Sequence, residues 1–132
     1  AHPPADPRRL RAAYAAYRPR SGAKTYARFG ELIGHLASLH PIRYGRLLKP
    51  LEAVFVEGLE PMVDQADALR FVHFIDKVYD QNVRLFVSAE CPLTDLFLPS
   101  YRELGYRKKY QRCLSRLAEL LDEAEVALAD LS

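Results

Sequence analysis

The sequence has 132 residues, of which 49% are hydrophobic and 27% are charged, and its formal net charge is +2. This length fits one domain that needs neither a structural metal nor a disulfide framework, so we expect Cys91 and Cys113 to be reduced thiols. The near balance of charges argues against a general nucleic-acid binder, and no apolar run approaches the ~20 residues that cross a membrane.

The chain opens with a proline-rich arm followed by a short helix. Three of the nine prolines lie in residues 1–8, and a helix is predicted over Arg9–Tyr17, opened by Asp6-Pro7 with proline in its first turn. Residues 18–22 contain proline and glycine and break this helix. We therefore expect residues 1–28 to form an arm and a short helix, and the main α/β domain to begin at residue 29.

Two short helical segments and a strand are predicted next. Apolar residues recur at helical spacing in residues 29–39, and Pro41 ends that pattern. Residues 43–49 predict one or two further helical turns. Ala53–Val56 is a short apolar run with β-forming residues, which predicts a buried strand.

A buried helix and a second strand follow. Asp64 is a suitable N-cap for a helix over residues 65–79, whose side chains are apolar almost all round. Val83–Val87 is a second apolar run. Strand, helix and strand within this length predict a parallel βαβ unit with a right-handed crossover. The fold class is therefore α/β: a small sheet containing a parallel βαβ unit, flanked by helices, within a single domain over residues 29–132.

The predicted βαβ unit also locates a candidate ligand side. In such units, ligands bind at the carboxyl edge of the strands. That edge carries Glu57-Gly58 after the first predicted strand and Ser88-Ala89-Glu90 after the second. Ser88 and Glu90 are therefore candidate site residues.

A final helix is predicted from Arg107 towards Leu131, with basic residues beside its apolar face. Arg112 and Arg116 lie four residues apart on one stripe of this helix. Two interpretations are open. Glu119 and Glu123 on the same stripe neutralise the arginines, or the two guanidinium groups hold an anion or a carboxylate of a partner.

The predicted helix over residues 65–79 contains charged residues that need partners. Arg70 and Asp76 lie on this almost wholly apolar element, so we expect each to form a structural ion pair or a hydrogen bond. His73 lies among aromatic residues and is expected to be a core or boundary histidine. None of the four histidines has the spacing of a zinc site.

Residues 21–25, Ser-Gly-Ala-Lys-Thr, are superficially similar to the end of a phosphate loop but do not fit it. The motif requires glycine directly before lysine, between a strand and a helix, whereas here Ala23 separates Gly22 from Lys24. No Asp-Glu pair closes an apolar strand to hold Mg²⁺. We therefore expect the chain alone to be inactive towards ATP and to hold neither ATP nor Mg²⁺ as a cofactor.

Three segments resemble motifs of a known family, in the same order. They are residues 68–80 (ALRFVHFIDKVYD), residues 83–92 (VRLFVSAECP) and residues 112–119 (RCLSRLAE). Weaker similarity extends the match over about residues 29–120. On these motifs the chain resembles the C-terminal part of the AFG1/ZapE family of AAA+ ATPases.

The resemblance implies a fold like the C-terminal portion of a P-loop NTPase. It also implies a parent protein that binds ATP and Mg²⁺ and couples hydrolysis to work on partner proteins, in the bacterial cytoplasm and peripherally at the division site. The implied partners are the N-terminal ATPase region, further copies of the protein and a division-ring protein, with no nucleic acid. In such a protein, the nucleotide-sensing or partner-contacting candidates are Arg112, Arg116, Arg70, Ser88 and Glu90.

The family's phosphate loop and Mg²⁺ motif lie well upstream in its members and are absent here. The chain also lacks an initiator methionine. These departures leave two expectations: an excised C-terminal region of such an ATPase, or a stand-alone divergent relative that binds a partner through its last helix.

Overall fold

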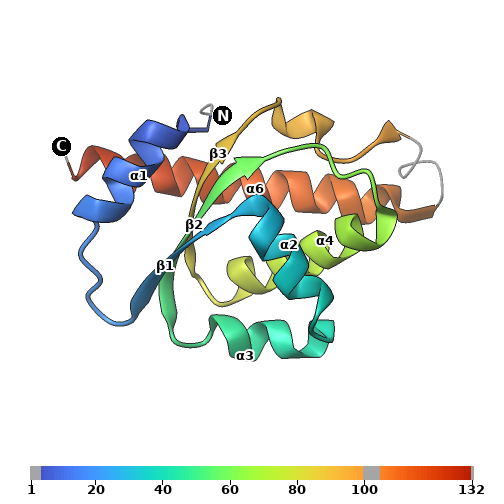
Figure 1. Cartoon of the computed structure of the whole chain (residues 1–132), viewed down its shortest axis with the longest axis horizontal. Helices are drawn as coiled ribbons and strands as arrows, with labels where there is room; N and C mark the ends of the chain where they lie inside the picture. The colour runs from blue at the N-terminus through green and yellow to red at the C-terminus, as the bar shows by residue number, and fades with distance from the viewer. Residues whose placement is uncertain (1–3, 100–104, 132) are drawn as a thin grey trace.

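The computed structural model describes residues 4–99 and 105–131, and a three-stranded parallel sheet forms its centre. The strands are β1 (Ala23–Arg28), β2 (Leu51–Leu59) and β3 (Arg84–Ala89), and they lie side by side in chain order (Figure 1). β2 and β3 are parallel neighbours joined through helix α4 (Gln65–Asp80), which confirms the predicted βαβ unit. The α/β class is also confirmed.

The strand β1 is an element that the sequence did not predict. Residues 18–22 were interpreted as a break, and no element was assigned to residues 23–28. β1 nevertheless pairs in parallel with β2, with Tyr26 opposite Phe55 and Arg28 opposite Glu57. Its interior residues are only half-buried, and basic and small side chains interrupt its apolar pattern. An edge strand of this kind gives a weak sequence signal, because tertiary packing decides strand formation as much as propensity does.

Helices cover both faces of the sheet. On one face lie α2 (Phe29–Ala37), α3 (Tyr44–Leu48) and α4, with the short 3₁₀ turn η1 (Pro41–Arg43) before α3. On the other face lies α1 (Pro7–Ala16). The turn η2 (Leu93–Asp95) follows β3. This arrangement satisfies the need of a parallel sheet for cover on both sides.

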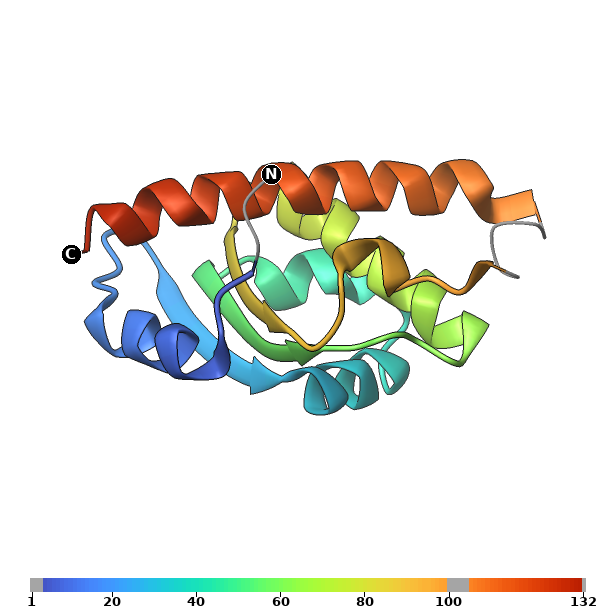
Figure 2. The ribbon, with the colours of Figure 1, turned by 90° about the horizontal axis from the view of Figure 1, so that it is seen from above.

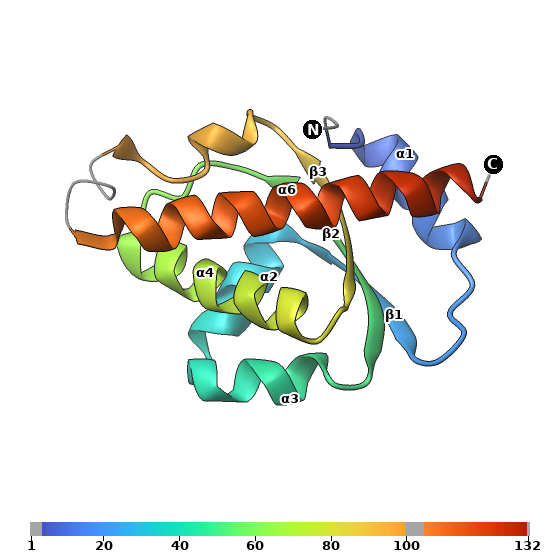
Figure 3. The ribbon, with the colours of Figure 1, turned by 180° about the vertical axis from the view of Figure 1, so that it is seen from behind.

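The last helix, α6 (Arg107–Ala129), packs beside β3 and reaches both faces of the sheet. Its first half contributes Tyr110, Cys113 and Leu117 to the core shared with α2 and α4. Its last turns contribute Ala124 and Ala127 to the core under α1. Figure 2 shows α6 running along the whole length of the molecule, and Figure 3 shows it crossing beside β3.

The N-terminal helix is built as the sequence predicts and packs on the same sheet as the rest of the chain. The side chain of Asp6 accepts a hydrogen bond of 2.8 Å from the backbone N–H of Arg9, and Pro7 is in the first turn. Leu10 and Ala13 are buried against β2 and β3. The domain boundary expected at residue 28 thus falls between β1, a strand of this sheet, and α2, a helix that covers the sheet.

Helix α4 has an exposed stripe, contrary to the expectation of a helix buried almost all round. Asp64 caps it by accepting a 2.8 Å hydrogen bond from the backbone N–H of Ala66, as predicted. Phe71, Ile75 and other apolar residues are buried, but His73 is exposed. The expectation of a core or boundary histidine is therefore wrong, because this position faces solvent rather than α6 or the sheet.

None of the helices in the described part of the chain is long and apolar enough to span a membrane.

Candidate functional site

The carboxyl edge of the sheet brings together polar residues from all three strands. Arg28 ends β1 and lies opposite Glu57 of β2. Ser88, near the end of β3, is fully buried, and its hydroxyl oxygen accepts a 2.8 Å hydrogen bond from the backbone N–H of Gly58. Gly58 has a positive φ of 83°, which favours glycine at this bend. Ser88 therefore holds the strand ends together.

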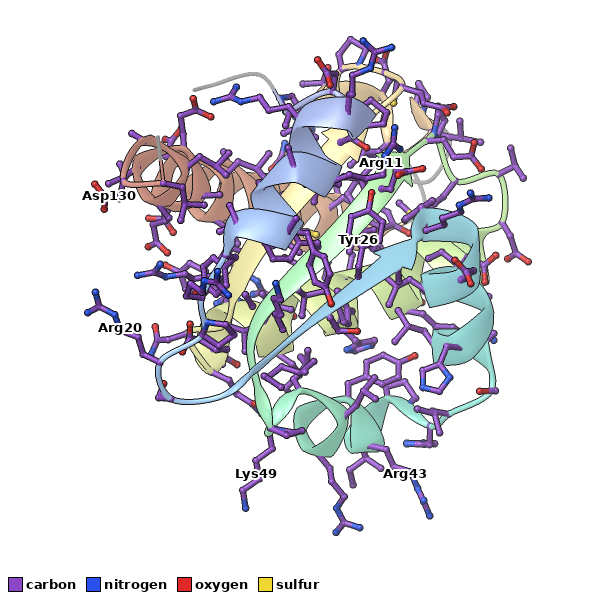
Figure 4. The ribbon with its side chains drawn as sticks, turned by 60° about the vertical axis from the view of Figure 1, so that its left-hand side comes forward. Arg11, Arg20, Tyr26, Arg43, Lys49 and Asp130 are labelled. Carbon is purple, nitrogen blue, oxygen red and sulfur yellow. The ribbon has the colours of Figure 1, made fainter. Side chains whose placement is uncertain are left out.

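Glu57 is the centre of a polar cluster on the α1 side of this edge. Its carboxylate accepts hydrogen bonds from the Tyr26 hydroxyl and from Arg11 Nη1 at 2.9 Å, and Arg28 Nε lies 4.0 Å away. The Tyr26 hydrogen bond and the Arg11 guanidinium hold the pKa of Glu57 below its usual value. Burial and the neighbouring carboxylate raise the pKa of Tyr26 to about 12. Figure 4 shows Arg11 and Tyr26 on this side of the sheet.

A second polar cluster lies at the opposite, amino edge of the strands. Glu52, at the start of β2, accepts hydrogen bonds from the Tyr17 hydroxyl at 2.5 Å and from the backbone N–H groups of Arg20 and Ser21, both at 2.8 Å. These bonds lower the pKa of Glu52 to about 2. The Glu52 carboxylate thus fastens the segment between α1 and β1 to the sheet. A cavity of about 570 Å³ adjoins it, with Arg18, Arg20 and Arg84 in its lining.

Replacing Glu52 by Gln is expected to lower the free energy of unfolding at pH 7 by about 1 kcal/mol, since hydrogen bonds to the charged carboxylate are lost. The folded pKa of Glu52 is depressed from 4.5 to about 2. Its contribution is therefore present above about pH 4.5 and is lost as the pH falls towards 2. Thermal unfolding between pH 7 and pH 2 should show the two proteins converging in that range. Glu60→Gln, at an exposed position after β2, is the control, and an equal pH profile for both variants would contradict the assignment.

Arg116 on α6 is held by α4. Its Nη1 lies 2.6 Å from Asp76 Oδ1, and its guanidinium carbon lies 4.9 Å from the centre of the Tyr79 ring. Both charged side chains are about a quarter exposed. The expectation that Asp76 needs a partner is confirmed. The interpretation that Glu119 and Glu123 neutralise the two arginines is wrong for Arg116, whose ion pair is with Asp76 of the facing helix. The carboxylate of Glu119 instead raises the pKa of Tyr79.

The other candidate residues lie in separate places. Arg70 pairs with Asp67 on the same helix at 2.9 Å, as a structural ion pair. Arg112 is exposed, and no ion pair joins it to a carboxylate of the described residues. Glu90 is exposed at the carboxyl edge, where its backbone N–H donates to the carbonyl of Leu59 at 2.9 Å. Ser88 and Glu90 therefore share the carboxyl edge, whereas the three arginines belong to α4 and α6.

Sequence reasoning missed Glu52 and Tyr26 as members of polar clusters. Tyr26 lies on β1, and Glu52 lies on β2, the strand that pairs with β1. Because the sequence pattern did not predict β1, it gave no indication that these two residues meet polar neighbours. A tyrosine flanked by basic residues, as in the segment Lys24–Arg28, is the one local hint of an alternating strand.

The described residues offer no activated nucleophile of the thiol type and no metal centre. Burial raises the pKa of both Cys91 and Cys113, which favours the unreactive thiol form. No group of three histidine, cysteine, aspartate or glutamate side chains in residues 4–99 and 105–131 is arranged to hold a metal ion. The polar clusters around Glu52 and Glu57 fasten elements of the fold together.

A parallel sheet with helices on both faces and polar residues at its carboxyl edge defines a small α/β domain of the P-loop-NTPase-like kind. The chain belongs to the family of AFG1-like ATPases, whose family model matches residues 8–128. That match includes α1 and β1 as well as the βαβ unit.

Curated relatives carry a more particular name. A segment of 59 residues is 39% identical to the "Cell division protein ZapE" of Escherichia coli strain K12, and the same values hold for the protein of that name in Escherichia coli O157:H7. The segment covers 45% of this chain and only 15% of either relative. The chain thus spans a small part of the length of these relatives. No solved structure matches the chain.

Proposed function

We propose that this chain is the C-terminal region of an AFG1/ZapE-type ATPase whose phosphate loop lies upstream of these residues, and that the chain is inactive towards ATP by itself. The observation that carries the second part is the position of Lys24. Its ammonium group donates hydrogen bonds to the carbonyls of Tyr14 at 2.5 Å and Tyr17 at 3.1 Å, and it lies 4.3 Å from the centre of the Tyr14 ring. The lysine of the phosphate-loop-like segment is thus occupied in attaching α1 to β1.

The residues at the carboxyl edge do not fit Mg-ATP either. A triphosphate site needs a glycine-rich loop with free backbone N–H groups and a carboxylate for the metal. Glu57, one carboxylate of this edge, is already bonded to Arg11 and Tyr26, whereas Glu90 at the same edge is exposed to solvent. The hydroxyl of Ser88 accepts a bond from Gly58 and is buried. ATP and Mg²⁺ are therefore assigned to the upstream part of the parent protein, and no step of hydrolysis is assigned to these residues.

Within the parent, the region supports an ATPase that does work on partner proteins in the cytoplasm, at the bacterial division site. This proposal is supported by membership of the ATPase family and by the name of the Escherichia coli relatives. Arg112 is the arginine best placed to sense nucleotide or to contact another subunit or a division protein, because it is exposed and not held by a described carboxylate. Arg116 supports Arg112 by holding α6, the helix that carries both residues, on α4.

The second candidate is a stand-alone interaction module, and the surface of α6 favours it. Arg107, Lys108, Lys109 and Arg112 are all exposed at the start of this helix. None of them forms an ion pair with a carboxylate in the described part of the chain. A basic helix end of this kind suits an acidic partner protein.

The length of the native protein separates the two candidates. Mass spectrometry of the protein isolated from its source, with sequencing of its gene, should show a product several times longer than 132 residues that carries an upstream Gly-x-x-x-x-Gly-Lys-Ser/Thr motif. A native product that consists of these residues alone would overturn the ATPase proposal and support the interaction module.

A further inference from the structure

The cavity of about 570 Å³ at the amino edge of the strands lies between the end of α1 and the end of α6. Its size falls within the ~300–1,000 Å³ of ligand pockets in proteins. Three arginines line it, Arg18, Arg20 and Arg84, together with Asp130 at the end of α6. The cavity is at the opposite edge of the sheet from Ser88 and the other carboxyl-edge residues.

The three arginines are positioned by the fold. Arg84 begins β3 and lies on the α1 face of the sheet, because it pairs with Ala53, which belongs to the core under α1. Burial and the Glu52 carboxylate raise the pKa of Tyr17, and the guanidinium of Arg84 opposes this shift, which places Arg84 beside Tyr17. Arg18 and Arg20 lie in the segment between α1 and β1 that the Glu52 carboxylate fastens to the sheet.

The positive charge of these arginines is largely uncompensated. None of them lies within ion-pair distance of a carboxylate among the residues that the structure describes. The two oxygens of Glu52 accept their hydrogen bonds from neutral donors, the Tyr17 hydroxyl and backbone N–H groups. Asp130 is the other carboxylate of the lining. Three guanidinium groups therefore face one carboxylate that is not already bonded in this way.

The helix ends at this edge explain only part of this charge. The carboxyl ends of α1, α4 and α6 carry partial negative charge, which nearby arginines would offset. However, two of these ends have a cation of their own. Lys24 donates to the carbonyls of Tyr14 and Tyr17 at the end of α1, and Lys77 lies in the last turn of α4. The end of α6 has no basic residue in its last turn, so it alone needs an arginine from this cavity.

The chemistry of the cavity favours carboxylates as its ligands. Guanidinium groups bind carboxylates and phosphates in the same paired geometry. Here the positive charge is divided among three groups on two segments, while Glu52, Asp130 and the helix ends repel a dense dianion more strongly than single carboxylates. Carboxylates that are spaced along one ligand match this distribution.

The openness of the cavity favours a peptide over a small molecule. Arg18, Arg20 and Arg84 are all exposed, as are Ser21 and Asp130. A small molecule usually buries ~70–90% of its surface in its pocket, which a lining so exposed does not provide. An extended acidic segment is held by charges along its length and keeps its outer side in water. Figure 4 shows Arg20 and Asp130 on one side of the molecule, away from Arg43.

We propose that the cavity at the amino edge binds an acidic segment of a partner protein, with its carboxylates held by Arg18, Arg20 and Arg84. This site goes beyond the proposed function, because it holds for the chain whether or not an ATPase region lies upstream. It is also separate from the basic start of α6. Arg112 lies about 27 Å from Asp130 along that helix, at ~1.5 Å per residue.

Modification of the native protein by phenylglyoxal, read for each arginine by mass spectrometry, tests the site. The ligand is a blocked peptide, Glu-Ala-Glu-Ala-Glu, at ~1 mM in ~0.15 M salt, and the control peptide has glutamine in place of glutamate. The acidic peptide is expected to slow modification of Arg18, Arg20 and Arg84 by about fivefold and the control peptide to have no effect. Arg43, exposed on η1, should react at the same rate throughout.

Three results of this experiment would overturn the proposal. Equal protection of Arg43 would show general screening of charge rather than a site. Equal or greater protection by citrate at the same carboxylate concentration would make the ligand a small molecule. Protection by pyrophosphate but not by the acidic peptide would make it a phosphate compound.

Two pairs of variants give the matched comparison for binding of the labelled acidic peptide, measured by fluorescence anisotropy. Arg84→Gln and Arg20→Gln are each expected to raise Kd by about threefold to tenfold, because each removes a charged donor from the site. Arg43→Gln removes the same charge elsewhere and should change Kd by less than about 1.5-fold. Arg20 is exposed, so its variant keeps the test valid if Arg84→Gln lowers the melting temperature. The same Kd for Arg20→Gln and Arg43→Gln would overturn the proposal.

Discussion

Replacing Phe55 by Ala should lower the free energy of unfolding by about 3–5 kcal/mol, the usual range for a fully buried phenylalanine. Phe55 lies at the centre of β2 and is completely buried. Its ring centre is 4.4 Å from that of Phe86 and 5.1 Å and 5.9 Å from those of Tyr14 and Tyr17. The substitution therefore removes the side chain on which α1 packs and leaves a cavity between α1 and the sheet.

Urea unfolding measures this loss, with Val63→Ala as the control. Val63 is 85% exposed, so its truncation should change stability by less than about 0.5 kcal/mol. The amides of α1 should also lose protection from hydrogen exchange in Phe55→Ala. A loss below about 1 kcal/mol would contradict the packing of α1 on the same sheet as the βαβ unit.

Replacing Arg116 by Ala should lower the free energy of unfolding by about 1–2 kcal/mol, because the half-buried Asp76 carboxylate would lose its charged hydrogen-bond donor. Both side chains retain some solvent contact, which limits the effect. Arg112→Ala is the matched control on the same helix. With no described ion pair to lose, it should change stability by less than about 0.5 kcal/mol.

A double-mutant cycle with Asp76→Ala isolates the pair, and a coupling energy of about 1 kcal/mol is expected. Equal, small effects of Arg112→Ala and Arg116→Ala, without coupling to Asp76, would contradict the contact between α4 and α6.

The same two variants separate the structural from the functional arginine in the full-length ATPase. Arg112→Ala is expected to lower the rate of ATP turnover about tenfold or more, while the melting temperature stays unchanged. A loss of this size is typical when a positive charge that stabilises negative charge developing in the transition state is removed. Unchanged turnover in both variants would leave the arginines structural and favour the interaction module.

The βαβ unit could be predicted because each of its parts carries a local signal. The runs Ala53–Val56 and Val83–Val87 are apolar and rich in β-formers, and Asp64 marks the start of the helix between them. The strand β2 extends further than predicted, from Leu51 to Leu59. Its extra residues pair with neighbours at the two edges, where hydrophobic pattern is no guide.

The edge strand and the long-range ion pair could not be predicted by the same reasoning. β1 is stabilised by pairing with β2 and by the contact of Tyr26 with Glu57, both of which depend on the assembled sheet. Arg116 finds its partner 40 residues away on α4, while the helical stripe suggested Glu119 and Glu123 from its own helix. The position of a residue on a helical stripe indicates its neighbours within that helix only. Packing between α4 and α6 decides which carboxylate Arg116 contacts.

Calorimetric titration of Mg-ATP into residues 1–132 tests the central claim, that this is a region of an ATPase without its own nucleotide site. We expect no binding tighter than about 1 mM, because Lys24 and Glu57 are occupied by neighbouring groups and the phosphate loop is missing. The full-length parent, titrated in parallel, should bind Mg-ATP at least ~100-fold more tightly through its upstream motifs. Micromolar affinity in the isolated chain would contradict the account.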